Sequence, residues 1–138
     1  MFNRILIPVD LTDKNETALA AARELVAESG TVVLLHVIET IADAPFEDMQ
    51  DFYQRLEEKA RSAMSEMAAS LDTHEVAIEQ QVVYGRRASE IVAFAQEKQA
   101  DLIVLSSIPL DPDNPGAAWA SISHQVTILA RCPVLLLK

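Results

Sequence analysis

The sequence is poor in several residue types, and each shortage excludes a class of structure. It contains one cysteine, which excludes an internal disulfide and a zinc site built from several cysteines. Only three of its 138 residues are glycine, so the chain is neither collagen-like nor a flexible low-complexity polymer. No apolar run approaches the ~20 residues that a membrane-spanning helix requires.

Basic residues are also scarce. The sequence contains eleven lysines and arginines and twenty-one acidic residues, which gives a formal net charge of −10. Such a charge repels phosphate backbones, so we expect no nucleic-acid partner. The N-terminal residues lack the basic, apolar and small-residue regions of a signal peptide. We therefore expect a soluble, cytoplasmic protein without a membrane partner.

Half of the residues are apolar, which suits a single domain over residues 1–138. Short runs of mostly branched apolar residues recur between segments with helical periodicity. Four of these runs are apolar nearly throughout, which indicates parallel strands covered on both faces. The third run alternates in polarity and predicts a strand at the edge of the sheet. The predicted strands are residues 5–9, 31–37, 76–84, 102–105 and 134–137.

Four helices are expected between the strands. The first begins at a capping box formed by Asp13 and Glu16, and it ends at Gly30. The second covers residues 46–71, and the third covers residues 88–99. The last carries an apolar stripe made of Trp119, Ile122, Val126 and Leu129.

This alternation predicts an α/β fold with an open, doubly wound parallel sheet of five strands and helices on both faces. Ligands of such sheets bind at the carboxyl ends of the strands, where the strand order reverses. The candidate binding residues are therefore those at or just after the strand ends. They include Pro8, Val9, Asp10, Val37, Ser106 and Ser107.

Four segments together resemble the universal stress protein family. They are Arg4-Ile-Leu-Ile-Pro-Val-Asp10, Val33-Leu-Leu-His-Val37, Tyr84-Gly85 with Ala88, Ile91 and Ala95 following, and Cys132-Pro-Val-Leu-Leu136. Each motif is weak alone, but together they cover essentially the whole chain in order and at family-like spacing. The resemblance implies a Rossmann-like fold, similar to that of adenine nucleotide alpha hydrolases, with strand order 3-2-1-4-5. It also implies a role in survival under stress. A homodimer formed through the C-terminal strand, residues Val134, Leu135, Leu136 and Leu137, is implied as well.

Members of this family that bind ATP share a Gly-x2-Gly-x9-Gly-Ser signature before the last helix. When the signature is counted back from Cys132-Pro133, its glycines fall on Ser107, Leu110 and Ala120, and only Ser121 remains. Glycine is needed where the backbone approaches phosphate oxygens closely. The sequence therefore predicts a protein without a robust ATP-binding loop.

The same segment opposes a triphosphate on physical grounds. Its prolines, Pro109, Pro112 and Pro115, lack amide donors, and Asp111 and Asp113 add negative charge. Asn114 and Pro115 suit the N-cap and first residue of the last helix. A helix that begins there would consume the amides near Ser121.

Other features of the family's pocket persist. The resemblance places Asp10 against base and ribose, Val37 against adenine, and Ser121, Ile122 and Ser123 in the binding segment. These residues, with Pro8, Val9, Ser106 and Ser107, form the predicted cofactor-binding set for ATP or AMP, and no cofactor is required. Asp10 equally suits a cap for the turn that contains Thr12.

The remaining reactive side chains are predicted to have structural roles. His36 lies inside a strand, and no sequence motif places a histidine where it could activate Cys132. No catalytic residue and no metal site are predicted.

We interpret the chain as a homodimeric stress-response regulator that contacts an unidentified protein partner. The alternatives are an ATP- or AMP-dependent switch, and slow ATP hydrolysis or autophosphorylation at Ser121 or Ser123. Large residues at the start of the long helix, Phe46, Met49, Phe52 and Tyr53, are a candidate partner surface.

Overall fold

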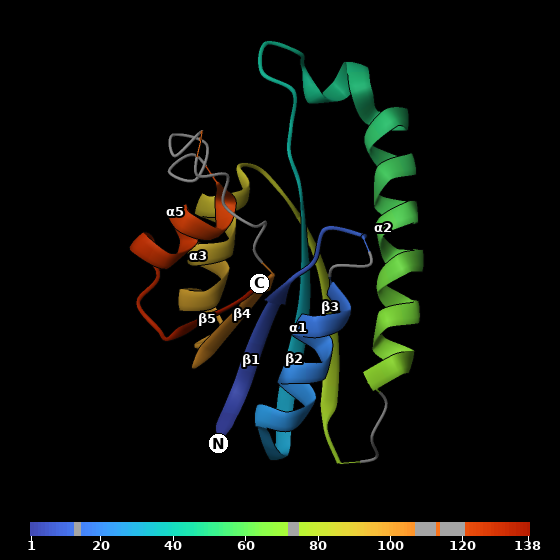
Figure 1. The fold of residues 1–138 in the computed structure, drawn as a ribbon. Helices are drawn as coiled ribbons and strands as arrows, with labels where there is room; N and C mark the ends of the chain where they lie inside the picture. Colours follow the sequence, from blue (N-terminus) through green and yellow to red (C-terminus); the bar gives the residue numbers. More distant parts are fainter. Residues whose placement is uncertain (13–14, 72–74, 107–112, 114–120) are drawn as a thin grey trace.

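The computed structural model describes residues 1–12, 15–71, 75–106, 113 and 121–138. Its parallel sheet has five strands in the order β3-β2-β1-β4-β5, which confirms the predicted fold class and order. The strands are β1 (Phe2–Pro8), β2 (Val26–Ile38), β3 (Ala77–Tyr84), β4 (Leu102–Ser106) and β5 (Val134–Leu137). Helices α1 (Asn15–Leu25) and α2 (Gln50–Leu71) cover one face, and α3 (Arg87–Glu97) and α5 (Ile122–Leu129) cover the other (Figure 1). No helix in the described part of the chain is both long and apolar enough to cross a membrane.

The core consists of two layers because successive side chains of a strand point to opposite faces of the sheet. In β1, Ile5 and Ile7 pack on the α1 and α2 side, whereas Leu6 packs on the α3 and α5 side. All three are at most 1% exposed. The apolar runs in the sequence therefore reflect strands that are buried on both faces.

Strand β3 lies at one end of the sheet, as its alternating sequence predicts. Ala77, Glu79 and Gln81 are exposed, whereas Ile78 and Val82 are half-buried against the cluster beside α1 and α2. One face of β3 is thus solvated, which is why its sequence alternates while that of the central strands does not.

The first helix ends earlier than predicted. Helix α1 stops at Leu25, and the chain pairs directly with β1 through Val26 and Phe2. Gly30 lies inside β2 beside an irregularity in the pairing, next to Ser29 with φ of 62°. A Cβ at Gly30 would lie 2.8 Å from the backbone oxygen of Ala27. The glycine therefore permits a close backbone approach within β2 rather than ending a helix.

The last helix begins later than predicted. Ser121 has extended backbone angles, φ −68° and ψ 148°, and its Oγ accepts a hydrogen bond from the His124 amide at 3.2 Å. Ser121 is therefore the N-cap of α5, and a helix running continuously from Asn114 is wrong. The predicted apolar stripe of this helix is only partly buried, because Val126 is fully buried but Leu129 is 53% exposed. Asp13, Asn114, Pro115 and Trp119 lie outside the described residues.

The second helix extends past the sheet. A 3-10 turn, η1 (Phe46–Met49), leads directly into α2, so the predicted segment 46–71 is helical throughout. Figure 1 shows η1 and the first turns of α2 standing beyond the carboxyl ends of the strands. We call residues 39–55 the arm.

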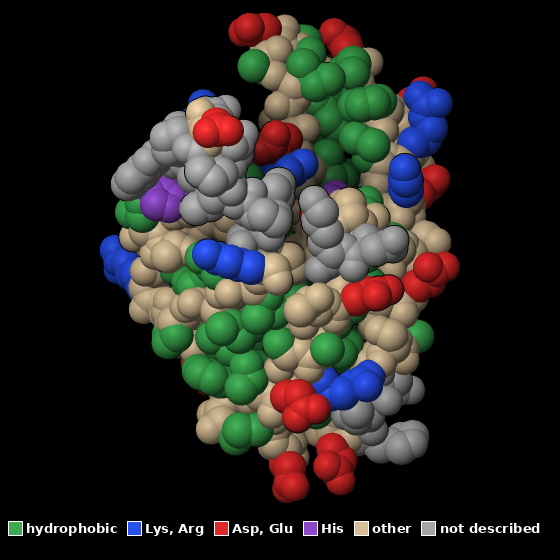
Figure 2. Space-filling model, viewed as in Figure 1, with side chains coloured by type: hydrophobic (Ala, Val, Ile, Leu, Met, Phe, Trp, Pro, Cys, Tyr) green, Lys and Arg blue, Asp and Glu red, His purple; other side chains and the backbone are tan. Residues whose placement is uncertain are grey.

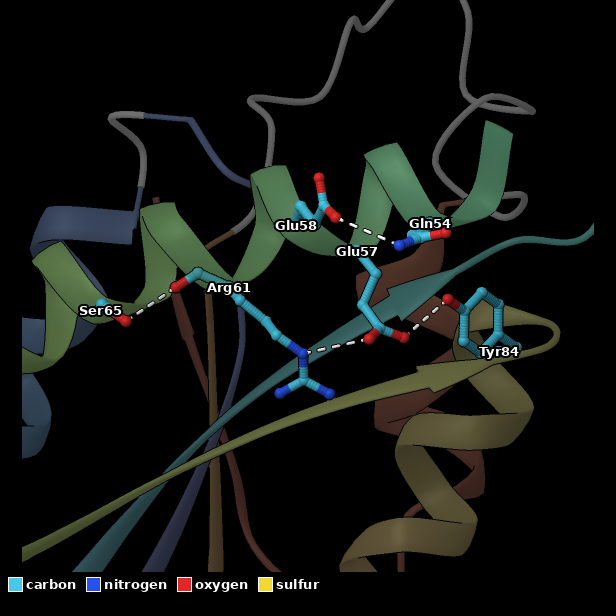
Figure 3. Close-up of polar contacts among 6 residues, drawn as sticks. All are labelled: Gln54, Glu57, Glu58, Arg61, Ser65 and Tyr84. Carbon is cyan, nitrogen blue, oxygen red and sulfur yellow. Dashed lines mark hydrogen bonds and ion pairs between the residues drawn. The ribbon is translucent and has the colours of Figure 1, made fainter. Parts of the chain in front are cut away.

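A polar contact attaches α2 to β3 below the arm. The Tyr84 hydroxyl donates to Glu57 at 2.7 Å, and Arg61 Nε donates to the other oxygen of that carboxylate at 3.2 Å (Figure 3). The bond from Tyr84, with a further contribution from Arg61, holds the pKa of Glu57 below its ordinary value. Burial, assisted by Glu57, raises the pKa of Tyr84 to about 12. The tyrosine therefore stays protonated at neutral pH and keeps donating to the carboxylate.

Candidate functional site

The strand order reverses between β1 and β4, and most of the described candidate residues gather there. Pro8 is paired with Leu35, and Ile5 with Leu102. When these registers are continued, Asp10 lies beside Val37 and Val9 lies beside Ser106. Strand ends at such a reversal form the usual ligand crevice of an open α/β sheet.

Two hydrogen bonds fix the carboxyl end of β1. The Val9 amide donates to the Leu35 carbonyl at 2.8 Å, and the Val9 carbonyl is 2.8 Å from Nδ1 of His36. Because a carbonyl only accepts, Nδ1 carries the proton in this contact. His36 is therefore a residue that positions the strand end, which agrees with its predicted structural role.

Asp10 caps the turn that follows β1. Its Oδ1 accepts from the Thr12 amide at 3.0 Å, from the Thr12 hydroxyl at 2.6 Å and from Asn15 Nδ2 at 2.9 Å. Leu11, between Asp10 and Thr12, adopts a φ of 66°, a left-handed conformation that the surrounding contacts must hold in place. The turn-cap interpretation of Asp10 is confirmed. Its contact with a ribose stays a prediction.

Asn15 is a residue of this site that the sequence reasoning missed. It is 3% exposed, and its Nδ2 donates to the Thr12 carbonyl at 2.9 Å as well as to Asp10. A buried amide at the first residue of α1 thus ties the helix to the strand end. The signal in the sequence was the close spacing of Asp10, Thr12 and Asn15. These are short polar residues whose side chains can form hydrogen bonds with backbone groups a few residues away.

The start of α5 contributes the second part of the candidate site. This helix leads into β5, which is parallel to the other strands, so its N-terminus lies at the carboxyl end of the sheet (Figure 1). The amides of Ile122 and Ser123 are the first two of the helix and find no acceptor inside it. The Oγ atoms of Ser121 and Ser123 are 3.4 Å apart. This geometry removes the argument that a helix running through Ser121 closes the anion site.

The candidate residues differ in how accessible they are. Val9 and Val37 are each 5% exposed, whereas Pro8, Ser106 and the segment 121–123 are half-buried and Asp10 is exposed. Val37 packs in the core cluster beside α3 and α5. Ser107 lies outside the described residues. Polar groups suited to a ligand are thus contributed by Asp10, Ser106 and the first turn of α5.

A free cysteine, Cys132, lies away from this crevice, because it precedes the start of β5 at the amino end of the parallel sheet. Burial, with a smaller contribution from Asp101, raises the pKa of the Cys132 thiol. A raised pKa disfavours the nucleophilic thiolate, which agrees with a structural role for this cysteine. In the part of the chain that the structure describes, no group of three or more His, Cys, Asp or Glu side chains is placed to hold a metal ion.

Solved structures reproduce this architecture. The structure of protein MJ0577 aligns with 100% of this chain and 96% of its own length, with a TM-score of 0.82 and 24% identity. A universal stress protein in complex with cAMP gives a TM-score of 0.73 at 18% identity, covering 99% of this chain and 97% of its own. An Arabidopsis thaliana family protein with AMP bound gives 0.67 at 18% identity, covering 99% and 91%. These likenesses establish the fold.

Sequence comparisons extend over the same length. Universal stress protein MJ0531 of Methanocaldococcus jannaschii is 26% identical over 142 residues, covering 100% of this chain and 83% of the relative. Universal stress protein G of Shigella flexneri is 26% identical over 144 residues and is covered completely. The model of the universal stress protein family matches residues 1–138. With the full length matched and the 3-2-1-4-5 sheet in place, the chain belongs to the universal stress protein family.

Proposed function

We propose that this chain is a homodimeric stress-response regulator that acts by association, with no reaction of its own. The observation that carries the proposal is the apolar edge at β5. This strand ends the described sheet, and its residues Val134, Leu135, Leu136 and Leu137 are all half-buried. In α5, the helix that precedes β5 in the chain, Ile128 is 63% exposed and Leu129 is 53% exposed. An edge strand with apolar neighbours is a template for pairing with another strand.

A second copy of the chain fits this edge better than an unrelated strand does. A twofold axis through β5 would place the same strand of each copy side by side, so both edges would be covered at once. Figure 2 shows hydrophobic side chains gathered in the region of β4 and β5. Such an interface hides the apolar surface that a monomer of net charge −10 would leave in water.

Charged substitutions test the dimer. We expect Ile128→Asp, at an exposed position, and Leu136→Asp, in the edge strand, each to convert the protein from dimer to monomer, measured by light scattering. A buried carboxylate without a partner costs several kcal/mol. Gln81→Asp on the solvated face of β3 is the matched control and is expected to remain dimeric. Circular dichroism reports whether each variant is folded. A wild-type monomer, or folded dimers for both test variants, would contradict the proposal.

A second candidate function is binding of an adenine nucleotide with one phosphate. The N-cap at Ser121 supports it, because the helix N-terminus offers amide donors and a partial positive charge to an anion. Related structures that contain AMP and cAMP also support it. The missing glycines and the added prolines and aspartates of residues 107–120 favour a monophosphate over ATP.

A thermal-shift experiment separates these functions. We expect AMP and cAMP to raise the melting temperature more than ATP with Mg²⁺ does, because the segment 107–120 favours a monophosphate. A ligand at about 100 times its dissociation constant adds about 2.7 kcal/mol to the free energy of unfolding. Ser121→Asp keeps a capping side chain but sets a negative charge against the phosphate, so it should abolish the shift, whereas Ser121→Asn should keep it. No shift at millimolar nucleotide would remove the second candidate and leave the regulator. Transfer of labelled phosphate from ATP that is lost in Ser121→Ala would favour autophosphorylation instead.

A further inference from the structure

The arm presents apolar surface that the fold does not cover. Ile41 and Phe46 are each 48% exposed, and Phe52 is 38% exposed. Figure 2 shows hydrophobic side chains gathered on the part of the molecule that stands beyond the sheet. These three side chains are here called the arm patch. They lie toward the end of the sheet opposite β5, because α2 packs on β2 and β3. The dimer edge therefore does not account for their exposure.

The arm patch is rigidly supported from beneath. Phe46 stacks on Tyr53 with ring centres 5.1 Å apart and meets the edge of Tyr84 at 5.6 Å. Phe52 meets Tyr53 edge-on at 5.4 Å. Tyr53 itself is 1% exposed, and its hydroxyl oxygen accepts from the Ile41 amide at 2.8 Å. A surface held in this way loses little conformational entropy when it binds a partner.

The surroundings of the arm patch are strongly acidic. Residues 39–52 contain five carboxylates and no lysine or arginine, and all five are exposed: Glu39, Asp43, Glu47, Asp48 and Asp51. Two arginines border the segment. Arg87 Nε lies 4.0 Å from Glu39, and Arg55 Nε donates to the backbone oxygen of Asp51 at 3.3 Å. Even with both arginines counted, the arm carries excess negative charge around its apolar centre.

Charge decides between the possible occupants. A second copy of the chain would bring the same carboxylates to the interface, and an anionic lipid surface would be repelled in the same way. A partner that offers both apolar side chains and cations satisfies both features of the surface. Basic amphipathic helices, whose apolar stripe is flanked by lysine or arginine, have this composition.

We propose that the arm patch binds a basic amphipathic segment of another protein. The apolar stripe of that segment packs on Ile41, Phe46 and Phe52, and its cations face the carboxylates of residues 39–52. This inference rests on the proposed function as a regulator that acts by association, and it names the surface and the chemistry of the partner. Its three apolar side chains include none of the residues assigned above to the β5 edge or to the crevice at Asp10.

A designed peptide tests the inference. The probe is a fluorescein-labelled amphipathic peptide of about 18 leucines and lysines, with the leucines at helical spacing, followed by anisotropy at about 0.15 M salt. We expect saturable binding to the full chain. Ile41→Ser with Phe52→Ser, and separately Asp48→Asn with Asp51→Asn, should each raise the dissociation constant by about tenfold or more. Ile41→Ser alone lies outside α2 and should weaken binding without affecting the helix.

Matched controls make the outcome decisive. Glu16→Gln with Glu24→Gln removes the same number of charges from exposed positions of α1, and it should change the dissociation constant by less than about twofold. A leucine and glutamate peptide should not bind. The inference is overturned by equal weakening in the control, by no saturable binding at about 100 μM peptide, or by phosphatidylglycerol vesicles that bind the wild type but not Ile41→Ser with Phe52→Ser. Dimer mass, measured in parallel, reports on the proposed function separately: a monomer that still binds the peptide contradicts only the dimer.

Discussion

Replacing Tyr53 by alanine is expected to lower the free energy of unfolding by about 3–5 kcal/mol, the usual cost of removing a large buried aromatic side chain. Tyr53 is 1% exposed and lies against Phe46, Phe52 and Tyr84. Its removal leaves a cavity under the arm and takes away the acceptor of the Ile41 amide. Urea denaturation followed by circular dichroism measures the change.

Tyr53→Phe separates packing from hydrogen bonding in this prediction. It keeps the ring and removes only the hydroxyl, so a loss of about 1 kcal/mol is expected. The phenylalanine variant should also retain binding of the leucine and lysine peptide, whereas Tyr53→Ala should lose it along with the supported surface. If the alanine variant were destabilised no more than the phenylalanine variant, the aromatic cluster would not be what holds the arm.

The secondary structure was predictable where burial alone decides it. Strands such as residues 102–105 are apolar nearly throughout because both faces of the central sheet are covered, and β3 alternates because one face is solvated. Gly30 misled the prediction because a glycine permits either a helix end or a close backbone approach. The pairing of Val26 with Phe2 determines that Gly30 lies within a strand, and this pairing joins residues that are distant in sequence.

The candidate site was predictable in its location and only partly in its contacts. The fold rule places ligands at the strand reversal, which identified Val9, Asp10 and Ser106. It did not identify the contact of His36 with the Val9 carbonyl, because that contact depends on the register between neighbouring strands. The start of α5 was mispredicted because Asn114 and Pro115 carry strong helix-start signals, whereas the Ser121 cap depends on local backbone geometry.

The strand order keeps the two proposed interaction surfaces apart. Strand β5 lies at one end of the sheet, and the arm belongs to α2, which packs on β2 and β3 toward the other end. A dimer formed through β5 would therefore leave both arms accessible to partners. Each dimer would carry two copies of the arm, and two linked sites can hold a partner more tightly than one.

Replacing Asp10 by alanine is the second large effect expected. The change removes Oδ1 as the acceptor for both Thr12 groups and for Asn15. Thr12 is exposed and can turn to water, but Asn15 is 3% exposed and would keep a buried amide proton without its partner. A loss of about 2–3 kcal/mol in the free energy of unfolding follows, measured by urea denaturation.

Two further variants show which partner of Asp10 carries this stability. Asp10→Asn retains a carbonyl oxygen at the same place and loses only the charge, so it should cost about 1 kcal/mol. Thr12→Ala removes an exposed donor and should cost less than Asp10→Ala, because no buried group is left without an acceptor. If Thr12→Ala cost as much as Asp10→Ala, the exposed part of the turn would hold the strand end. The buried amide of Asn15 would then not be the reason that an aspartate is needed after β1.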